Sequence, residues 1–153
     1  MNPISREILS DPEFRRVVGY QVRKYRTGQL IVEEGDPCAE LFVVLEGAAA
    51  VYSAVEHQGR PGHWSELANF SAGDVIGELS LFDQQPRNAS VAAASDCEVA
   101  VMDIRSLANY MDDNPGSGYW ILKNLSLQAF ERLRRTNQRY KALVALSPEG
   151  LAD

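Results

Sequence analysis

Two residues of opposite charge, Glu78 and Arg87, lie in one glycine-containing stretch, residues 73–91, and their side chains suit two parts of one ligand. A guanidinium carries a rigid fork of N–H donors that matches two oxygens of a phosphate. A carboxylate accepts hydrogen bonds from hydroxyl groups and repels phosphate. The pair therefore predicts a pocket for a sugar phosphate, in which Arg87 binds the phosphate and Glu78 binds the sugar.

The residues around this pair allow a ligand to approach the backbone. Gly77 has no Cβ, so a ligand can lie close to its main chain. Residues 78–82 can form one short helical turn, whose unpaired N–H groups attract negative charge. Ser80 and Ala89 are small at the places where a ligand would press closest. These features strengthen the prediction of an anion-binding pocket.

Each of the two charged residues also has an interpretation that involves no ligand. Arg87 could be a surface arginine paired with Asp83 or Glu78, and Glu78 could be a helix cap or the ion-pair partner of Arg87. We favour the ligand for Arg87, because the arginine follows a helix-start segment that already concentrates anion-binding N–H groups. For Glu78 we favour a hydroxyl acceptor, because a buried carboxylate without a partner would be costly.

The order and spacing of these residues resemble a known motif. The runs 77–81 (Gly-Glu-Leu-Ser-Leu) and 86–91 (Pro-Arg-Asn-Ala-Ser-Val) are similar to the phosphate-binding cassette of cyclic-nucleotide-binding domains of the catabolite activator and protein kinase A regulatory type. The resemblance covers roughly residues 22–140, most of the chain. It includes four residues that fall where the roll of these domains makes its turns: Gly28, Gly35, Asp36 and Gly47.

The resemblance implies a ligand and a role for each cassette residue. The ligand would be a cyclic nucleotide, with cAMP as the first candidate and cGMP as the second. The arginine would take the phosphate, the carboxylate the ribose 2′-hydroxyl, and the N–H groups of Ser80 and Ala89, with the Ser80 hydroxyl, would donate to the phosphate. Asn88 occupies a position that helps to choose the base in the family. The implied binding residues are Ile76, Gly77, Glu78, Leu79, Ser80, Arg87, Asn88 and Ala89.

A second segment resembles a base-binding element of the same family. Residues 132–137 (Arg-Leu-Arg-Arg-Thr-Asn) are similar to the Arg-Leu-x-x-Thr-Ser segment with which catabolite activator proteins meet adenine across a dimer. The resemblance implies that Thr136 and Asn137 cover the base. The alternative, that both are ordinary polar positions in a helical dimer seam, stays open.

Composition and charge limit the class of protein. The chain has 153 residues, 45% hydrophobic and 24% charged, which fits one globular domain with its own core. A formal net charge of -6 at pH 7 argues against general attraction to nucleic acid or membrane surfaces. Cys38 and Cys97 are the only cysteines and fit no metal-binding spacing, and no run of about 18 apolar residues occurs. We therefore expect a soluble, cytoplasmic protein with reduced thiols.

The order of elements predicts an α+β, mainly β fold: a double-stranded β-helix, or jelly-roll barrel, with short N-terminal helices and a long C-terminal helix. A polar cap, an early proline and an acid at residues 10–13 indicate a helix start. Short apolar runs bounded by glycine turns indicate strands at 22–26, 28–32, 41–45, 48–55, 64–70, 91–94 and 97–102. The expected divisions of the single domain 1–146 are helices at 1–20, β-roll at 21–102 with the cassette at 76–91, and hinge plus long helix at 103–146, followed by a tail at 147–153.

The hinge should contain a short helix at 103–111 and a breaker at 112–118, before one amphipathic helix at 119–146. An apolar stripe on this helix has a/d-like spacing over about three heptads and extends past so small a roll, which predicts a parallel homodimer. The alternative is that the stripe packs on its own roll. The stripe residues are Leu122, Leu125, Ala129, Leu133, Thr136, Tyr140 and Leu143.

Five basic residues of this helix could suggest a nucleic-acid surface: Arg132, Arg134, Arg135, Arg139 and Lys141. We expect no DNA binding, because residues 147–153 are too few for the DNA-reading module that follows the long helix in activator proteins. A solvated basic face, or a dock for an acidic protein partner, fits an acidic chain better. The same charges could also draw an anionic ligand inward.

Three classes of function remain. The first is a non-catalytic sensor that binds a cyclic nucleotide and relays the event to a protein partner through the hinge and the long helix. The second is an interaction or scaffold domain of the same fold that binds cGMP, cyclic di-GMP or no nucleotide. The third is an enzyme on a cupin-like barrel, which would need a metal. His57 and His63, in an expected exposed loop at 57–63, are too few ligands for one.

Overall fold

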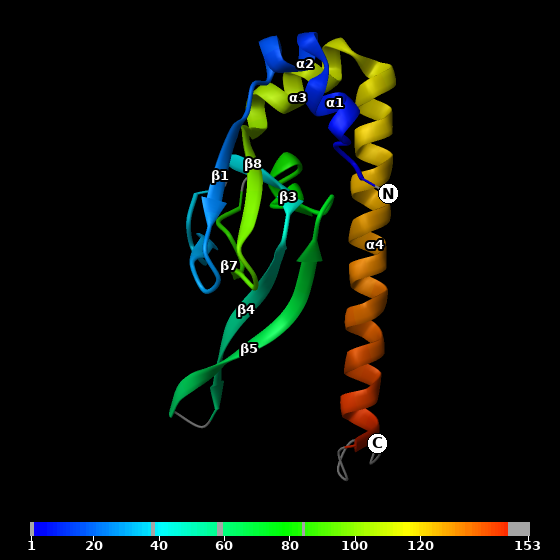
Figure 1. The fold of residues 1–153 in the computed structure, drawn as a ribbon. Helices are drawn as coiled ribbons and strands as arrows, with labels where there is room; N and C mark the ends of the chain where they lie inside the picture. The colour runs from blue at the N-terminus through cyan, green and yellow to red at the C-terminus, as the bar shows by residue number, and fades with distance from the viewer. Residues whose placement is uncertain (1, 38, 58–59, 84, 147–153) are drawn as a thin grey trace.

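The computed structural model describes residues 2–37, 39–57, 60–83 and 85–146 of the chain. Two four-stranded antiparallel sheets form a roll, short helices cover one end of it, and one long helix runs along its side (Figure 1). The predicted fold is therefore confirmed: a jelly roll with short N-terminal helices and a long C-terminal helix.

The strand order is β1-β8-β3-β6 in one sheet and β2-β7-β4-β5 in the other. The first strand of the roll, β1, pairs directly with the last, β8, so the sheets close through contacts between residues far apart in the sequence. The strands are β1 (Gln21–Tyr25), β2 (Leu30–Val32), β3 (Glu40–Glu46), β4 (Ala48–His57), β5 (Arg60–Ser71), β6 (Val75–Ile76), β7 (Ser90–Ala93) and β8 (Cys97–Asp103). The sequence did not predict β6, whose two residues are too few to show an alternation.

Strand β3 separates two hydrophobic clusters, because successive side chains of a strand point to opposite faces. Leu41 and Val43 pack into the cluster beneath the helices, whereas Phe42 and Val44 pack into the cluster inside the roll. The inner cluster also contains Cys97, and burial raises the pKa of its thiol. Cys38 lies outside the described residues.

The short helices begin at side-chain caps. Asp11 accepts from the Phe14 N–H at 2.8 Å at the start of α2 (Pro12–Val17), which follows α1 (Arg6–Ser10). Asp103 accepts from the Ser106 N–H at 2.8 Å at the start of α3 (Ile104–Asp113). Hydrogen bonds from the Ser106 backbone and side chain lower the pKa of Asp103.

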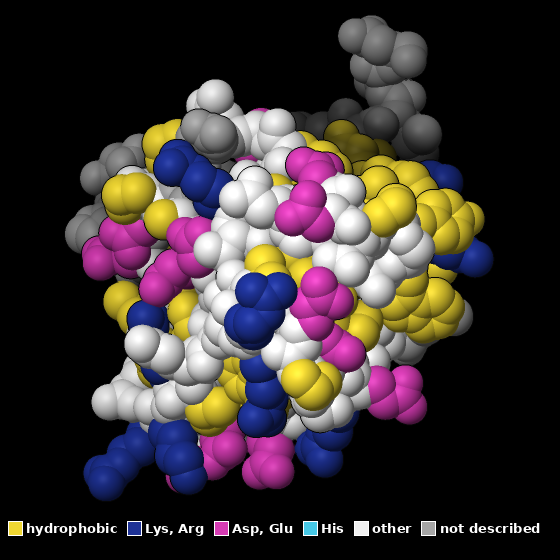
Figure 2. Space-filling model, turned by 90° about the horizontal axis from the view of Figure 1, so that it is seen from above, with side chains coloured by type: hydrophobic (Ala, Val, Ile, Leu, Met, Phe, Trp, Pro, Cys, Tyr) yellow, Lys and Arg dark blue, Asp and Glu magenta, His cyan; other side chains and the backbone are white. Residues whose placement is uncertain are grey.

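Both basic and acidic side chains are scattered over the end of the molecule that Figure 2 shows.

The long helix α4 (Pro115–Leu146) begins earlier than predicted. The expected break between the two helices is present but shorter than 112–118, because α3 ends at Asp113 and α4 starts at Pro115, with proline at the first helical position, where its missing N–H is harmless. Gly118 serves packing: a Cβ there would lie 2.6 Å from the carbonyl oxygen of Met111 in α3. The glycine thus allows the two helices to approach closely.

The β4–β5 hairpin is longer than predicted. Its strands run to His57 and from Arg60, whereas the sequence suggested an exposed loop at 57–63. Residues 58–59 of that loop lie outside the described part of the chain. Across the ranges that the structure describes, no three His, Cys, Asp or Glu residues group as metal ligands.

Helix α4 is buried only near its start, at Gly118, Ile121, Asn124 and Leu125. Leu125 is 2% exposed in the helix-side cluster, so its assignment to an intermolecular stripe is wrong. Leu133, Tyr140 and Leu143 are exposed along the part of α4 that extends down the side of the roll (Figure 1). Within the described ranges, no helix is long and apolar enough to cross a membrane.

Candidate functional site

The candidate site begins where β6 ends. Gly77 has φ +88° and ψ 21°, in the left-handed region that favours glycine, and it leads into a 3₁₀ turn, η1 (Glu78–Leu81). A Cβ at Gly77 would collide with the guanidinium of Arg87. Two independent constraints, backbone conformation and close approach, therefore require glycine here, and the predicted short helical turn is present.

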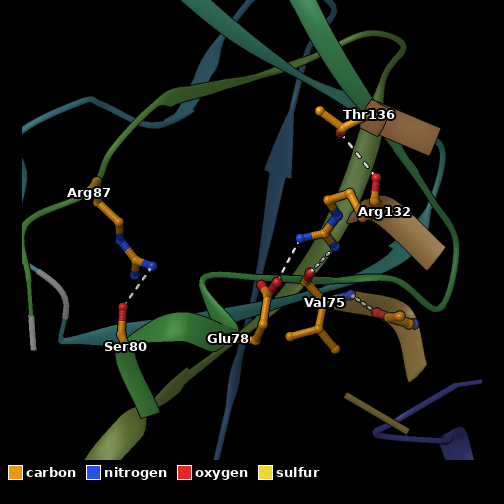
Figure 3. A network of polar contacts seen from close by, with 7 residues as sticks. Val75, Glu78, Ser80, Arg87, Arg132 and Thr136 are labelled. Atoms are coloured by element: carbon orange, nitrogen blue, oxygen red, sulfur yellow. Dashed lines mark hydrogen bonds and ion pairs between the residues drawn. The ribbon is translucent and has the colours of Figure 1, made fainter. Parts of the chain in front are cut away.

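The side chain of Arg87 turns inward and is only 8% exposed. Its Nη1 donates to Ser80 Oγ at 3.3 Å (Figure 3). Its Nη2 donates to the carbonyl oxygen of Glu40. The guanidinium carbon lies 5.8 Å from the centre of the Phe42 ring. Arg87 is therefore a buried cation whose polar contacts are made to neutral oxygens.

The two carboxylates considered as partners of Arg87 have other contacts. Among the residues that the structure describes, no ion pair includes Arg87. Glu78 pairs with Arg132, and Asp83 accepts from the Gln85 N–H at 3.4 Å. A buried charge is normally paired, so the interpretation of Arg87 as an ion-paired surface arginine is wrong. Its uncompensated charge suits an anion.

Glu78 is 7% exposed and contacts a residue of α4. Its Oε1 accepts from Arg132 Nη1 at 2.6 Å, and Arg132 Nη2 also donates to the carbonyl oxygen of Val75 at 3.5 Å (Figure 3). The Arg132 guanidinium stacks over the Phe70 ring at 4.6 Å. Glu78 thus has an ion-pair partner, but that partner is Arg132, 54 positions away in the sequence.

One helical turn before Arg132, Gln128 ties α4 to the same part of the roll. Its Oε1 accepts from the Val75 N–H at 3.2 Å, and its Nε2 donates to the Gly73 carbonyl at 3.3 Å. Residues four apart lie on one face of a helix, so Gln128 and Arg132 act together. The sequence did not reveal either contact, because both depend on the path of α4 across β6.

The turn at residues 33–36 holds the backbone next to Arg87. The Arg87 N–H donates to the Asp36 carbonyl at 3.0 Å, and the Gly35 N–H donates to the Arg87 carbonyl at 2.8 Å. Ser90 Oγ accepts from the Glu34 N–H at 3.0 Å. The turn that was predicted only as a feature of the roll therefore also supports the cassette.

The other predicted cassette residues occupy different environments. Ile76 is buried in the inner hydrophobic cluster, and Leu79 is exposed on η1. Asn88 is exposed and Ala89 is half-buried in the segment after Arg87. The structure brings Gly77, Ser80 and Arg87 into contact, but Ile76 contributes to the core. The ligand-binding roles of all these residues stay predictions.

The two predicted base-covering residues lie on α4, one turn beyond Arg132. Thr136 Oγ1 donates to the Arg132 carbonyl at 3.0 Å, within the helix (Figure 3). Both Thr136 and Asn137 are exposed. Their position near Arg132 is compatible with either a base contact or a place in a helical seam, so the choice stays open.

Residues 22–114 match the family described as cyclic nucleotide-binding domain. The chain belongs to this family. The match spans the roll, the cassette and α3, and so contains Glu78 and Arg87 within one recognised unit. The resemblance inferred from the cassette motif is confirmed at the level of the family.

Curated relatives of this domain are regulators. The cAMP-activated global transcriptional regulator CRP of Escherichia coli is 31% identical over 130 residues, covering 84% of this chain and 58% of the relative. The cAMP-dependent protein kinase regulatory subunit of Hypocrea atroviridis is 30% identical over 102 residues, covering 67% of this chain and 19% of the relative. This chain thus spans little more than half the length of the bacterial regulator.

Solved structures of cyclic nucleotide-binding proteins have the same fold. The catabolite activator protein of Thermus thermophilus superposes with a TM-score of 0.63 at 27% identity, covering 81% of this chain and 55% of that one. The c-di-GMP-responsive regulator CLP of Xanthomonas campestris superposes with a TM-score of 0.75 at 23% identity, covering 84% of this chain and 61% of that one. The second likeness concerns the fold alone.

Proposed function

We propose that this chain is a non-catalytic, cytoplasmic signalling module that binds a cyclic nucleotide, first cAMP and second cGMP, and relays binding to a protein partner. The observation that carries the proposal is the buried guanidinium of Arg87, which has no carboxylate partner among the described residues. A cyclic phosphate carries the missing negative charge and two oxygens that match the guanidinium fork. The names of the curated relatives favour cAMP.

In this proposal the phosphate replaces neutral acceptors. Arg87 exchanges Ser80 Oγ and the Glu40 carbonyl for phosphate oxygens, which form stronger, charge-assisted hydrogen bonds. The released Ser80 hydroxyl and the N–H groups of Ser80 and Ala89 donate to the same phosphate. Gly77, Leu79 and Ile76 form the adjoining wall, in which Gly77 leaves room for the ligand.

The ribose competes with α4 for Glu78. The 2′-hydroxyl of the nucleotide donates to the Glu78 carboxylate, which Arg132 contacts at 2.6 Å. The base then lies toward α4, where Thr136 and Asn137 cover it and Asn88 contributes to its selection. Because Arg132 belongs to α4, any change at Glu78 acts directly on the helix.

Binding is relayed to the partner because the ligand has different affinities for two states of the chain that differ in the position of α4. A ligand shifts such an equilibrium only as far as its affinities for the two states differ. Here the contacts at stake are those of Gln128 and Arg132 with β6 and η1, and the segment that absorbs the movement is the α3–α4 junction at Asn114. The partner reads the position of α4.

We also propose a homodimer through α4, because exposed apolar side chains continue along it at helical spacing after its buried start. Analytical ultracentrifugation of Leu133→Asp should show dissociation to monomers, because a carboxylate in an apolar seam is costly. Lys123→Asp, a charge change on an exposed position of the same helix, is the control. A wild-type chain that stays monomeric at high concentration contradicts the dimer.

A thermal-shift panel tests the ligand. The wild-type chain is heated with cAMP, cGMP, cyclic di-GMP or 5′-AMP, and a ligand at about 100 times its Kd should stabilise the fold by about 2.7 kcal/mol. We expect cAMP to raise the Tm most and 5′-AMP to have little effect. A rise only with cyclic di-GMP, or with none of the four, favours the alternative of an interaction or scaffold domain of the same fold.

A further inference from the structure

A cavity of about 190 Å³ lies between β5 and α4, next to the candidate site. Three arginines of α4 line it: Arg132, Arg135 and Arg139. Asn69 and Ser71 of β5 lie opposite them. None of the predicted cassette residues lines this cavity, but Gln128, Arg132 and Thr136 of α4 do, so the cleft is continuous with the candidate site along the helix.

The three arginines form a row that leads away from the cassette. At spacings of three and four residues they share one face of the helix. With a rise of 1.5 Å per residue, Arg135 lies about 4.5 Å and Arg139 about 10 Å beyond Arg132 along the axis. Arg132 at the near end already pairs with Glu78. The far end of the cleft therefore has Arg135 and Arg139 as its basic residues.

This row has an electrostatic cost. Like charges three and four residues apart repel each other on a helix surface. The sequence of α4 contains six basic residues and a single acidic one, although the whole chain has a net charge of -6. Two carboxylates line the cleft among the described residues. Asp74 accepts from the Ser71 N–H at 2.8 Å, and Glu131 enters no ion pair with another described residue.

Arg135 is the side chain best placed to receive an anion. In the part of the chain that the structure describes, no hydrogen bond or ion pair uses its guanidinium, and the residue is exposed to the cleft that it lines. A cleft of this size is smaller than the roughly 300 Å³ or more of a typical small-molecule pocket. It suits a single charged group, and the guanidinium fork matches a phosphate.

We propose that the far end of this cleft, centred on Arg135, is a second anion-binding site that takes a phosphate group. Two sources can supply the group. One is the second phosphodiester of a cyclic dinucleotide whose first phosphate lies on Arg87, and the other is a separate phosphate-bearing molecule bound beside a mononucleotide. The first source rests on the proposed phosphate-binding role of Arg87, whereas the second does not.

The test compares two arginines that are adjacent in sequence. Arg135→Ala removes a cleft guanidinium, and Arg134→Ala removes the same charge from an exposed position that does not line the cleft. Wild type and both variants are titrated with cyclic di-GMP and with inorganic phosphate at one ionic strength, followed by calorimetry and thermal shift. We expect Arg135→Ala to weaken binding by about tenfold or more, as for one charge-assisted hydrogen bond, and Arg134→Ala by less than about twofold.

The Arg87→Ala variant then separates the sources. If Arg87→Ala also weakens the binding of cyclic di-GMP, one dinucleotide spans both sites. If Arg87→Ala leaves the binding of phosphate unchanged, the second anion binds independently of the site at Arg87. Equal behaviour of Arg135→Ala and Arg134→Ala, or no binding of either probe to wild type, overturns the second site. Titration of the same variants with cAMP keeps the results distinct, because failure of the proposed function appears there as absent cAMP binding to wild type.

Discussion

The β-roll and helix α4 hold their arginines in different ways. Arg87 in the roll is buried, its backbone is fixed by the turn at 33–36, and its charge has no carboxylate partner among the described residues. Arg132 of α4 reaches the roll from outside, and its charge is paired with Glu78. Under the proposed function, this difference divides the work: the roll presents a fixed cation for a ligand, and the helix supplies a contact that a ligand can replace.

The same contrast exists within α4. Its first turns pack apolar side chains, such as Ile121 and Leu125, into the helix-side cluster. Farther along, among the described residues, Gln128 and Arg132 form side-chain hydrogen bonds to the roll. Burial of a large aliphatic side chain contributes several kcal/mol, whereas a typical hydrogen bond contributes about 1 kcal/mol net. The start of α4 is therefore an anchor, and its remainder is held to the roll by a few polar contacts.

Substitution of two neighbouring residues of α4 tests the anchor most strongly. Ile121 is 0% exposed and Leu122 is 38% exposed. Ile121→Ala should lower the free energy of unfolding by about 2 to 5 kcal/mol, because it leaves a cavity in the core, and Leu122→Ala by less than about 1 kcal/mol. Urea denaturation measures both. Similar losses in the two variants would show that the anchor does not depend on side-chain burial.

A pair of glycines compares the cassette with the helix. Gly77→Ala should cost roughly 1 to 3 kcal/mol of stability, because the residue has φ +88° and a Cβ there collides with Arg87. Gly116→Ala, in the first turn of α4 with open space around it, should instead stabilise the chain by about 0.4 to 1 kcal/mol. Thermal and urea unfolding of both variants decide the signs. An unchanged free energy of unfolding in Gly77→Ala would show that the close contact between Gly77 and Arg87 does not require glycine.

A smaller effect is expected at the one polar side chain buried in the anchor of α4. Asn124 is 1% exposed, its Nδ2 donates to the Trp120 carbonyl at 2.8 Å, and its Oδ1 has no hydrogen-bond partner among the described residues. Asn124→Leu keeps the approximate size and removes the unsatisfied oxygen, so it should raise the free energy of unfolding by about 1 kcal/mol. Asn137→Leu, on the exposed part of the helix, should stay within about 0.5 kcal/mol. A destabilised Asn124→Leu would show that the amide has a required partner.

Much of the roll could be predicted from the sequence, because its strands are short apolar runs and its turns are marked by glycine. Gly28, Gly35 and Gly47 all have positive φ, as turn glycines do. The cassette could also be predicted, because local structure brings Gly77, Ser80 and Arg87 together within a dozen residues. Family membership follows from this local pattern and is confirmed by the match over residues 22–114.

The contacts of α4 could not be predicted, because they join residues far apart in the sequence. The Glu78–Arg132 pair spans 54 positions and depends on the angle at which the helix leaves Asn114. A helical period shows which residues share a face, but not which surface that face meets. For this reason Leu125 was assigned to an intermolecular seam although it packs in its own core. The glycines at 116 and 118 suggested a longer break, because the sequence does not show which surface this part of the helix meets.

The central claim is that Arg87 binds the phosphate of a cyclic nucleotide, and calorimetric titration of wild type, Arg87→Ala and Arg134→Ala with cAMP tests it most directly. Arg87→Ala should weaken binding by on the order of 2 to 3 kcal/mol, the loss of a charge-assisted hydrogen bond and of the charge facing the phosphate. Arg134→Ala, which removes an exposed charge, should bind as wild type does. Wild-type affinity in Arg87→Ala would contradict the account.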